Sequence, residues 1–318
     1  MKQNQKFWSL IAISAAWSTV AFAQSTTTSS STPAAPSSTS VAEVKTEESS
    51  GFKLPVRLSY GVDVFGPRLT NPSDNWTATD AMSDQNDIAS QDPILLRHNA
   101  AIGRDVGAGI NLSAHAYFNT FMTDPANNGK TKGLKWRDSY VQASKGDLAA
   151  MTINGSELTL GGDLRYYAPT STTSRLNNNR GQVRMTVMPN LQFGKSIFSL
   201  ATVSYLKFWM HSQRLASGED GRATGAPMNE WEVYTGPQLT AQLTDSVAVW
   251  ALYEALLQRD TAGNLTNAAP YSGKALTDLE PGATFNIGKH FSISPFLNWY
   301  TALPVSTTSM NVSLSASI

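Results

Sequence analysis

Apolar and polar residues alternate along most of the chain from Phe52 to the C-terminus. In the clearest segment Leu58, Tyr60 and Val62 alternate with Ser59 and Asp63. Segments of this kind, roughly ten residues long with a period of two, predict β-strands that carry one apolar and one polar face. The pattern predicts about twelve strands, with ten or fourteen as alternatives.

The links between these segments are alternately short and long. Tight turns are predicted at residues 194–195, 243–245 and 288–290, whereas residues 71–93 and 211–229 form long polar loops. Among the short links we expect the one after the fourth strand, residues 146–157, to be the longest, and among the loops the first. In a transmembrane β-barrel the short turns lie on the periplasmic side and the long loops on the outer side. The fold class predicted is therefore all-β, a closed antiparallel transmembrane β-barrel, and an even strand count places both termini on the periplasmic side.

A soluble β-sandwich is the main alternative, because it would also bury one apolar face of each strand. The long strands, the systematic alternation of link lengths and the lack of a second layer of elements favour the barrel. Closure also satisfies every backbone polar group in lipid and leaves no sheet edge.

The N-terminal region has the three parts of an export signal. Lys2 and Lys6 precede an apolar run over residues 7–22, and Ala21-Phe22-Ala23 form a small-residue cleavage site. We therefore expect residues 1–23 to be a cleaved signal peptide. Residues 24–51, rich in Ser, Thr and Pro, are predicted to be a disordered periplasmic tail, and a plain linker is favoured over a peptidoglycan-binding segment. The barrel would then span residues 52–318.

Composition excludes several classes of function. The chain has no cysteine, which excludes disulfides, thiolate metal sites and lipoprotein attachment. The formal net charge is +0 and no basic stripe stands out, so no nucleic-acid partner is expected. His98, His211 and His290 have no spacing that indicates a shared metal site, and we expect neither a metal nor a cofactor.

Two stretches carry a resemblance to known proteins. The chain ends with Met310, Val312, Leu314, Ala316 and Ile318 alternating with polar residues. This end resembles the C-terminal signal that the outer-membrane assembly machinery recognises in bacterial barrel proteins, with isoleucine in place of the usual aromatic residue. The sequence RDSYV at 137–141, followed by LTLGG at 158–162, looks like the third and fourth strands of general porins.

The resemblance implies a member of the porin-like superclass in the outer membrane of a Gram-negative bacterium. Its partners would be outer-membrane lipid, lipopolysaccharide, the barrel assembly machinery and small hydrophilic solutes. A homo-oligomer is compatible with the small outward-facing residues Ala114 and Ala116.

Charged residues of the strands are expected to face the lumen, because a charge on the lipid face costs up to about 2–4 kcal/mol at the bilayer midplane. The early strands supply the basic members of this set and the late strands the acidic ones: Lys53, Arg57, Arg97, Arg165, Arg184 and Lys207, against Glu230, Glu232, Glu254, Asp278 and Glu280. Opposed basic and acidic walls would create a transverse field that selects dipolar solutes. We therefore expect a channel for passive diffusion of small hydrophilic solutes.

The alternative to a channel is a plugged or structural barrel that acts as an adhesion or interaction platform. Eight-stranded barrels have packed interiors and sixteen-stranded barrels have open channels, so about twelve strands lies between the two.

An enzyme is the less favoured hypothesis. Asn111, Ser113 and His115 share one strand face and are similar to the catalytic trio of outer-membrane phospholipases, whose motif is His-x-Ser in the reverse order. An activated serine needs its base within about 2.6–3.2 Å and a third group that orients the base. Because this face points to the lumen, away from lipid, we expect these residues to be polar lining and the protein not to be an enzyme.

Overall fold

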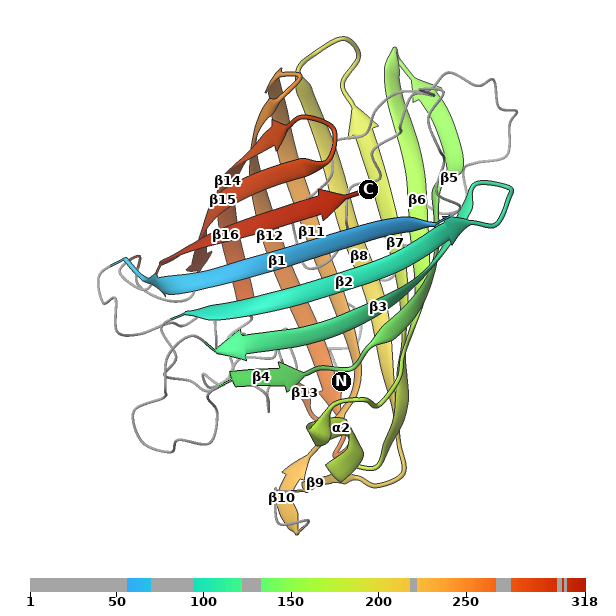
Figure 1. Cartoon of the computed structure of the whole chain (residues 1–318), viewed down its shortest axis with the longest axis vertical. Coiled ribbons are helices and arrows are strands. Elements are labelled where there is room, and N and C mark those ends of the chain that lie inside the picture. Colours follow the sequence, from blue (N-terminus) through green and yellow to red (C-terminus); the bar gives the residue numbers. More distant parts are fainter. Residues whose placement is uncertain are drawn as a thin grey trace, which may run out of the picture.

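The computed structural model describes residues 56–69, 94–121, 133–217, 222–266, 276–301, 305 and 308–318. Within these residues, twelve long strands pair antiparallel in the order β11-β8-β7-β6-β5-β3-β2-β1-β16-β15-β14-β12, and pairing of β11 with β12 closes the barrel (Figure 1). The twelve are β1 (Arg57–Arg68), β2 (Leu95–Asp105), β3 (Ile110–Phe121), β5 (Tyr140–Ile153), β6 (Ser156–Tyr167), β7 (Asn179–Gln192), β8 (Phe198–His211), β11 (Asn229–Thr244), β12 (Val247–Asp260), β14 (Leu276–Ile287), β15 (Phe291–Tyr300) and β16 (Ser309–Ser317). The predicted fold class is confirmed.

The remaining described elements are short and belong to the long loops. β4 (Gly133–Trp136) pairs with β3, β13 (Leu265–Thr266) pairs with β12, and β9 (Leu215–Ser217) pairs with β10 (Ala223–Pro227). The helix α2 (Thr172–Leu176) lies between β6 and β7. No helix among the described residues is long and apolar enough to span a membrane.

Short and long links alternate as predicted, and the first loop is the longest, but the expected long connection over residues 146–157 is wrong. Residues 146–153 continue β5, and the turn to β6 is only Asn154-Gly155. Both residues have positive φ, 51° and 79°, as a two-residue type I′ hairpin requires. A bulge between Lys145 and Ala149 shifts the register against β6. The bulge interrupts the period-two pattern, which made this part of the strand resemble a loop.

Both ends of the barrel chain lie at the rim that carries the short turns. Leu58 and Ile318 exchange backbone hydrogen bonds of 2.8 and 2.9 Å, which join the start of β1 to the end of β16. With twelve antiparallel strands, the five short turns share this rim and the six long loops share the other. Figure 1 shows β14 and β15 meeting near the upper end, whereas α2, β9 and β10 lie at the lower end.

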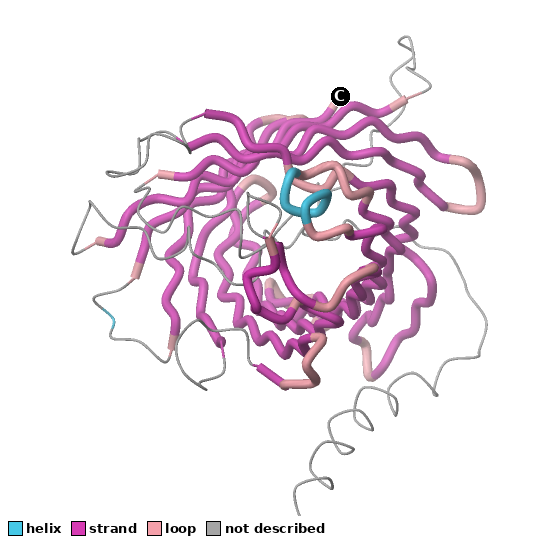
Figure 2. Tube along the Cα trace, turned by 90° about the horizontal axis from the view of Figure 1, so that it is seen from below, coloured by secondary structure: helices cyan, strands magenta, loops and turns pink. Residues whose placement is uncertain are grey.

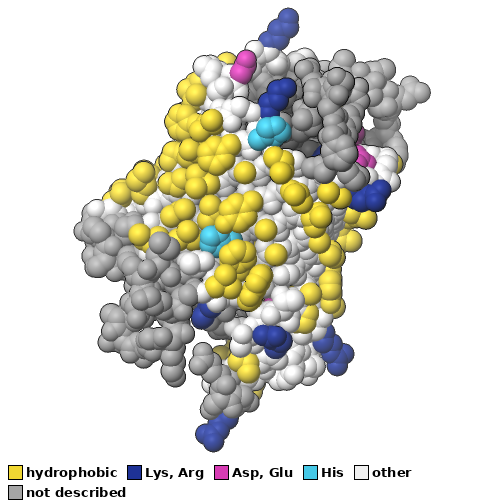
Figure 3. Space-filling model, viewed as in Figure 1, with side chains coloured by type: hydrophobic (Ala, Val, Ile, Leu, Met, Phe, Trp, Pro, Cys, Tyr) yellow, Lys and Arg dark blue, Asp and Glu magenta, His cyan; other side chains and the backbone are white. Residues whose placement is uncertain are grey.

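The outward face of the strands is apolar. Val141, Leu164 and Met185 come from adjacent strands and expose 54%, 52% and 56% of their surface. Apolar side chains cover much of the described wall in the view of Figure 3, while Lys and Arg gather mainly toward its two ends. This distribution suits a wall that contacts hydrocarbon along its middle.

The interior also contains apolar groups that the alternation did not predict. Trp250, Leu252 and Phe296 are buried in one cluster between β12 and β15. The Trp250 ring covers Gly282 of β14, where a Cβ would lie only 2.4 Å from a ring atom. The glycine is thus required for the ring to lie flat against the neighbouring strand.

The apolar outer face gives a direct prediction. Met185→Lys places a charge in the middle of β7 on the outward face, and we expect it to lower the free energy of unfolding in lipid by about 2–4 kcal/mol. Urea titration of the protein folded in vesicles would measure the change, with Met185→Leu as the matched control. A loss below about 0.5 kcal/mol would show that residue 185 does not face lipid.

Candidate functional site in the barrel interior

Three basic side chains form a row across neighbouring strands. Arg165 of β6 is in register with Arg184 of β7, which is in register with Lys207 of β8. Adjacent strands are about 4.8 Å apart, so the row spans about 10 Å of the wall. We call these three residues the basic ladder. At its end Lys207 is in register with Glu232 of β11, and their charged groups are 3.8 Å apart.

Asp163 holds one end of the basic ladder in position. The Arg165 Nε donates to Asp163 Oδ1 at 2.9 Å and its second terminal nitrogen donates to Oδ2 at 3.1 Å. Thr186 also donates to Asp163 at 3.0 Å and accepts from Arg184 Nε at 3.2 Å. One carboxylate therefore orients two arginines through a bidentate pair and a shared hydroxyl.

Aromatic rings support each cation from the side. The charged groups of Arg165, Arg184 and Lys207 lie 5.2, 4.3 and 4.3 Å from the ring centroids of Tyr140, Tyr205 and Trp209, respectively. Tyr205 also stacks on Tyr234 with centroids 4.7 Å apart. Such contacts stabilise a cation without neutralising it.

The carboxylates lie on the next strands round the wall. Glu254, Asp278 and Glu280 offer oxygens that all lie within 4.8 Å of one another. Asn298 donates to Asp278 and Glu280 at 2.8 and 2.6 Å, and Tyr234 donates to Glu254. A group of this geometry could hold an oxygen-ligated divalent cation. We call these three residues with Glu232 the acidic group.

The structure places the predicted lumen residues in three environments. Seven are buried, namely Arg97, Arg165, Arg184, Glu232, Glu254, Asp278 and Glu280, and the Lys207 side chain is 12% exposed. Arg57 is exposed, and Glu230 lies at the loop end of β11, where it pairs with Arg259 at 3.2 Å. Lys53 lies outside the described residues.

The expected opposition of two charged walls needs a correction. The basic ladder is on β6, β7 and β8, and the acidic group is on β11, β12 and β14, which follow directly in the sheet order. The basic ladder therefore adjoins the acidic group at the contact between Lys207 and Glu232, whereas the buried Arg97, on β2, lies six strands from β11 in the closed ring. The order of charges along the sequence did not reveal this, because it carries no information on distance round the wall.

A loop between β6 and β7 lies over the opening at the long-loop end, and sequence reasoning missed it. Figure 2 shows α2 inside the outline of the barrel. Asp138, buried just before β5, accepts from Ser171 N and Gln182 Nε2 at 2.9 Å each and from the Ser174 hydroxyl. Ser171 is also the N-cap of α2. The available signal was Ser171 before a short polar segment, which is typical of a helix start.

A second polar group lies on β2 and β3. Ser113 Oγ is 2.8 Å from His115 Nε2, and His115 Nδ1 is 3.0 Å from Asn99 Oδ1. Ser113 and His115 thus meet the distance condition that the sequence left open, but the third group is Asn99 of the neighbouring strand and not Asn111. Only the pairing of β2 with β3 brings Asn99 there.

Comparison with solved structures shows the same kind of barrel. An outer-membrane channel from Pseudomonas putida F1 is similar with a TM-score of 0.51 and 9% sequence identity, covering 84% of this chain and 97% of that chain. The NanC porin (TM-score 0.43, 8% identity, 83% and 98% covered) and the KdgM porin in complex with disordered oligogalacturonate (0.41, 9%, 82% and 99%) also match. No family model and no curated protein matches the chain. At 9% identity the likeness to the Pseudomonas putida F1 structure shows the fold alone, a closed antiparallel β-barrel.

Proposed function

We propose that this protein is an outer-membrane channel for passive diffusion of small hydrophilic solutes. The observation that supports it most strongly is a closed twelve-stranded barrel whose outward face is apolar and whose interior carries the basic ladder beside the acidic group. A barrel with this distribution is stable in a bilayer and presents fixed charges to whatever enters it.

The two charged sets create an electric field with a fixed direction in the barrel interior. An anionic group of a solute is attracted to Arg184 and its neighbours on β6 to β8, and a cationic group to the carboxylates on β11 to β14. Because the sets adjoin, the field runs along the wall from one to the other. Zwitterionic or dipolar solutes fit this arrangement better than apolar ones. Arg57, Lys53 and Glu230 would act at the two rims.

The same proposal specifies the cellular location of the protein and the orientation of its ends. Residues 1–23 would be removed on export, and residues 24–51 would form a periplasmic tail that leads into the short-turn rim. Both termini would then be periplasmic and the long loops extracellular. The partners would be lipid, lipopolysaccharide and the barrel assembly machinery, with a homo-oligomer compatible with the outer wall.

A plugged barrel is the second candidate, because the interior is tightly filled. Arg165, Glu232 and Asp278 are each 2% exposed or less, and α2 lies over one opening. A barrel in this state would act through its outer loops instead of its lumen.

Reconstitution in a planar bilayer distinguishes the two functions. We expect folded protein to give discrete conductance steps with weak preference between K⁺ and Cl⁻, because the interior carries both a basic and an acidic set of similar size. Protein folded to the same extent that gives no steps over many insertions would exclude the channel and favour the plugged barrel. A heat-unfolded sample is the control for conductance by contaminants.

A further inference from the structure

Ser113, His115 and Asn99 form a hydrogen-bonded chain on the inner wall. His115 and Asn99 are buried, while Ser113 is only half-buried. The two distances, 2.8 Å from serine to histidine and 3.0 Å from histidine to asparagine, are those of a nucleophile, its base and an orienting group.

The hydrogen bonds assign the histidine tautomer. The Asn99 Nδ2 donates to the Tyr140 hydroxyl at 3.3 Å, which turns its Oδ1 toward His115. An amide oxygen only accepts, so His115 Nδ1 carries the proton and Nε2 has the lone pair that faces Ser113. The His115 ring also stacks on Tyr140 with centroids 4.2 Å apart. The imidazole is therefore held in the orientation in which it can accept the serine proton.

The residues in register with Ser113 on its two sides are a glycine and a glutamine. Gly103 is in register with Ser113 on β2, and a Cβ there would lie 3.0 Å from the Ser113 Cβ. Gln142 is in register with it on β5, and its Oε1 has no hydrogen-bond partner among the described residues. Residue 103 thus places no side chain beside Ser113, and the side toward β5 carries the Gln142 amide.

The residues in register with Ser113 on the neighbouring strands lead into the basic ladder. Gln142 is in register with Arg165, which begins the ladder two strands from Ser113, about 10 Å away. A molecule with an anionic group at one end would place its other end near the serine.

From this geometry we propose that the barrel interior hydrolyses small water-soluble carboxylic esters that carry an anionic group. Ser113 is the nucleophile, His115 is the general base and then the general acid, and Asn99 is a positioning residue. The site acts on solutes inside the barrel and does not depend on whether they pass through it.

The reaction follows the acyl-transfer scheme. The Ser113 hydroxyl transfers its proton to His115 Nε2 as its Oγ bonds to the ester carbonyl carbon, and the Gln142 amide donates to the developing oxyanion. The alcohol leaves with the proton from His115, and an acyl group remains on Ser113. Water then gives a proton to His115 and attacks the acyl carbon. The bond between that carbon and Ser113 Oγ breaks, His115 returns the proton to Oγ, and the acid is released from the free serine.

Labelling with a fluorophosphonate probe tests the nucleophile in folded protein. We expect covalent labelling that mass spectrometry maps to Ser113, absent in Ser113→Ala and slowed about 10²-fold to 10³-fold in His115→Gln. Ser144→Ala is the control, because Ser144 faces the interior on β5 without a histidine partner. If the folded wild-type protein is not labelled at Ser113, the proposal is wrong, and this holds even where a variant fails to fold.

Substitutions of Asn99 distinguish a positioning role in the reaction from a purely structural role. Asn99→Ala should slow labelling about tenfold or more, whereas Asn99→Asp, whose carboxylate also accepts from Nδ1, should restore the rate. The Asp variant should also shift the pH profile of labelling upward, since a carboxylate stabilises the protonated imidazole. Equal rates in all three proteins would contradict the assigned role of Asn99.

A matched ester pair tests the substrate class. We expect faster hydrolysis of 4-acetoxybenzoate than of its neutral methyl ester, and loss of that preference in Arg184→Gln. Hydrolysis of neither ester by the wild-type protein would exclude the esterase. Bilayer conductance of the same samples reports on the channel independently, so that either function can fail without the other.

Discussion

Arg165→Met should lower the free energy of unfolding by about 3–5 kcal/mol, the range for removing one partner of a buried ion pair. Both side chains of the pair are 2% exposed. The substitution leaves the Asp163 carboxylate in the interior without its bidentate partner, with only the Thr186 hydroxyl among the hydrogen bonds described above. The buried charge must then be protonated or hydrated, and either change opposes folding.

Guanidinium titration in detergent, followed by the shift in gel mobility between folded and unfolded barrel, would measure this loss. Lys195→Met is the control, because Lys195 is exposed in the turn between β7 and β8. The double variant Arg165→Met with Asp163→Leu should be more stable than Arg165→Met alone, because it no longer contains the Asp163 carboxylate that has lost its ion-pair partner. A loss under 1 kcal/mol in the single variant would show that the pair does not secure the basic ladder.

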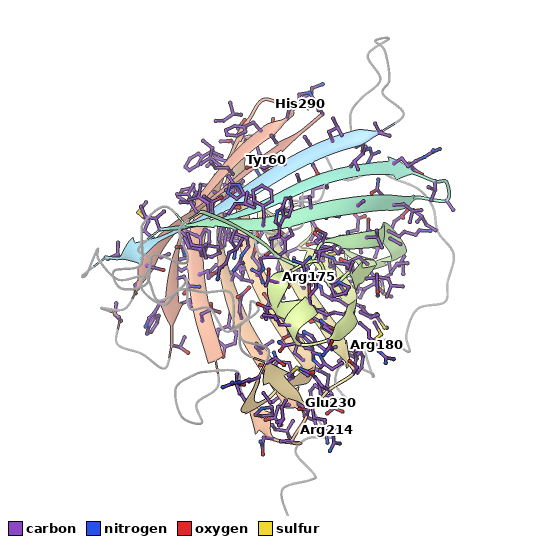
Figure 4. The ribbon with its side chains drawn as sticks, turned by 60° about the horizontal axis from the view of Figure 1, so that its bottom comes forward. Tyr60, Arg175, Arg180, Arg214, Glu230 and His290 are labelled. Carbon is purple, nitrogen blue, oxygen red and sulfur yellow. The ribbon has the colours of Figure 1, made fainter. Side chains whose placement is uncertain are left out.

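Asp138→Ala should release the loop that carries α2. The substitution removes the acceptor for Ser171 N, Ser174 Oγ and Gln182 Nε2, and hydrogen bonds to a charged group contribute about 1.5–3 kcal/mol each. Even one such loss raises the open population of the loop by about tenfold or more. We expect trypsin to cleave after Arg175 of α2 at least about tenfold faster; Figure 4 labels this arginine beside the coil of α2.

The matched control is Asp147→Ala, since Asp147 is exposed on β5 near the opposite rim. The gel shift of both variants should remain that of folded barrel, so that faster cleavage reports local opening. Unchanged cleavage in Asp138→Ala would mean that the other contacts of the loop, such as Ser217 N to Asn177 Oδ1 at 2.8 Å, hold it without the carboxylate.

The strand faces were predictable from the sequence, because a period of two repeats within each strand and needs no knowledge of its neighbours. Arg165 and Arg184 are buried while Leu164 and Met185 are exposed, as the alternation requires. The bulge after Lys145 could not be predicted, since it depends on pairing with β6. The apolar cluster around Trp250 could not be predicted either, because it depends on Gly282 in the next strand.

Only those contacts of the candidate sites that join residues close together in the sequence were predictable. Ser113 and His115 are two residues apart and share a face, so their contact follows from strand geometry. Asn99 reaches them from β2, and Asp138 reaches Ser171 and Gln182 across β5, β6 and β7. Such contacts depend on the registers of several strands, which one-dimensional spacing does not specify.

By itself the sequence determined the approximate number and the direction of the strands, their outward apolar face and the rim at which the barrel segment begins and ends, because alternation and link length are properties of consecutive residues. Only the tertiary structure decided how the interior groups are arranged relative to one another. It placed the basic ladder beside the acidic group, brought the loop with α2 over the opening and joined Asn99 to His115. The physical reason is closure: once the sheet closes on itself, residues far apart in the chain share one confined space, and their charges and hydrogen-bonding groups must satisfy one another there.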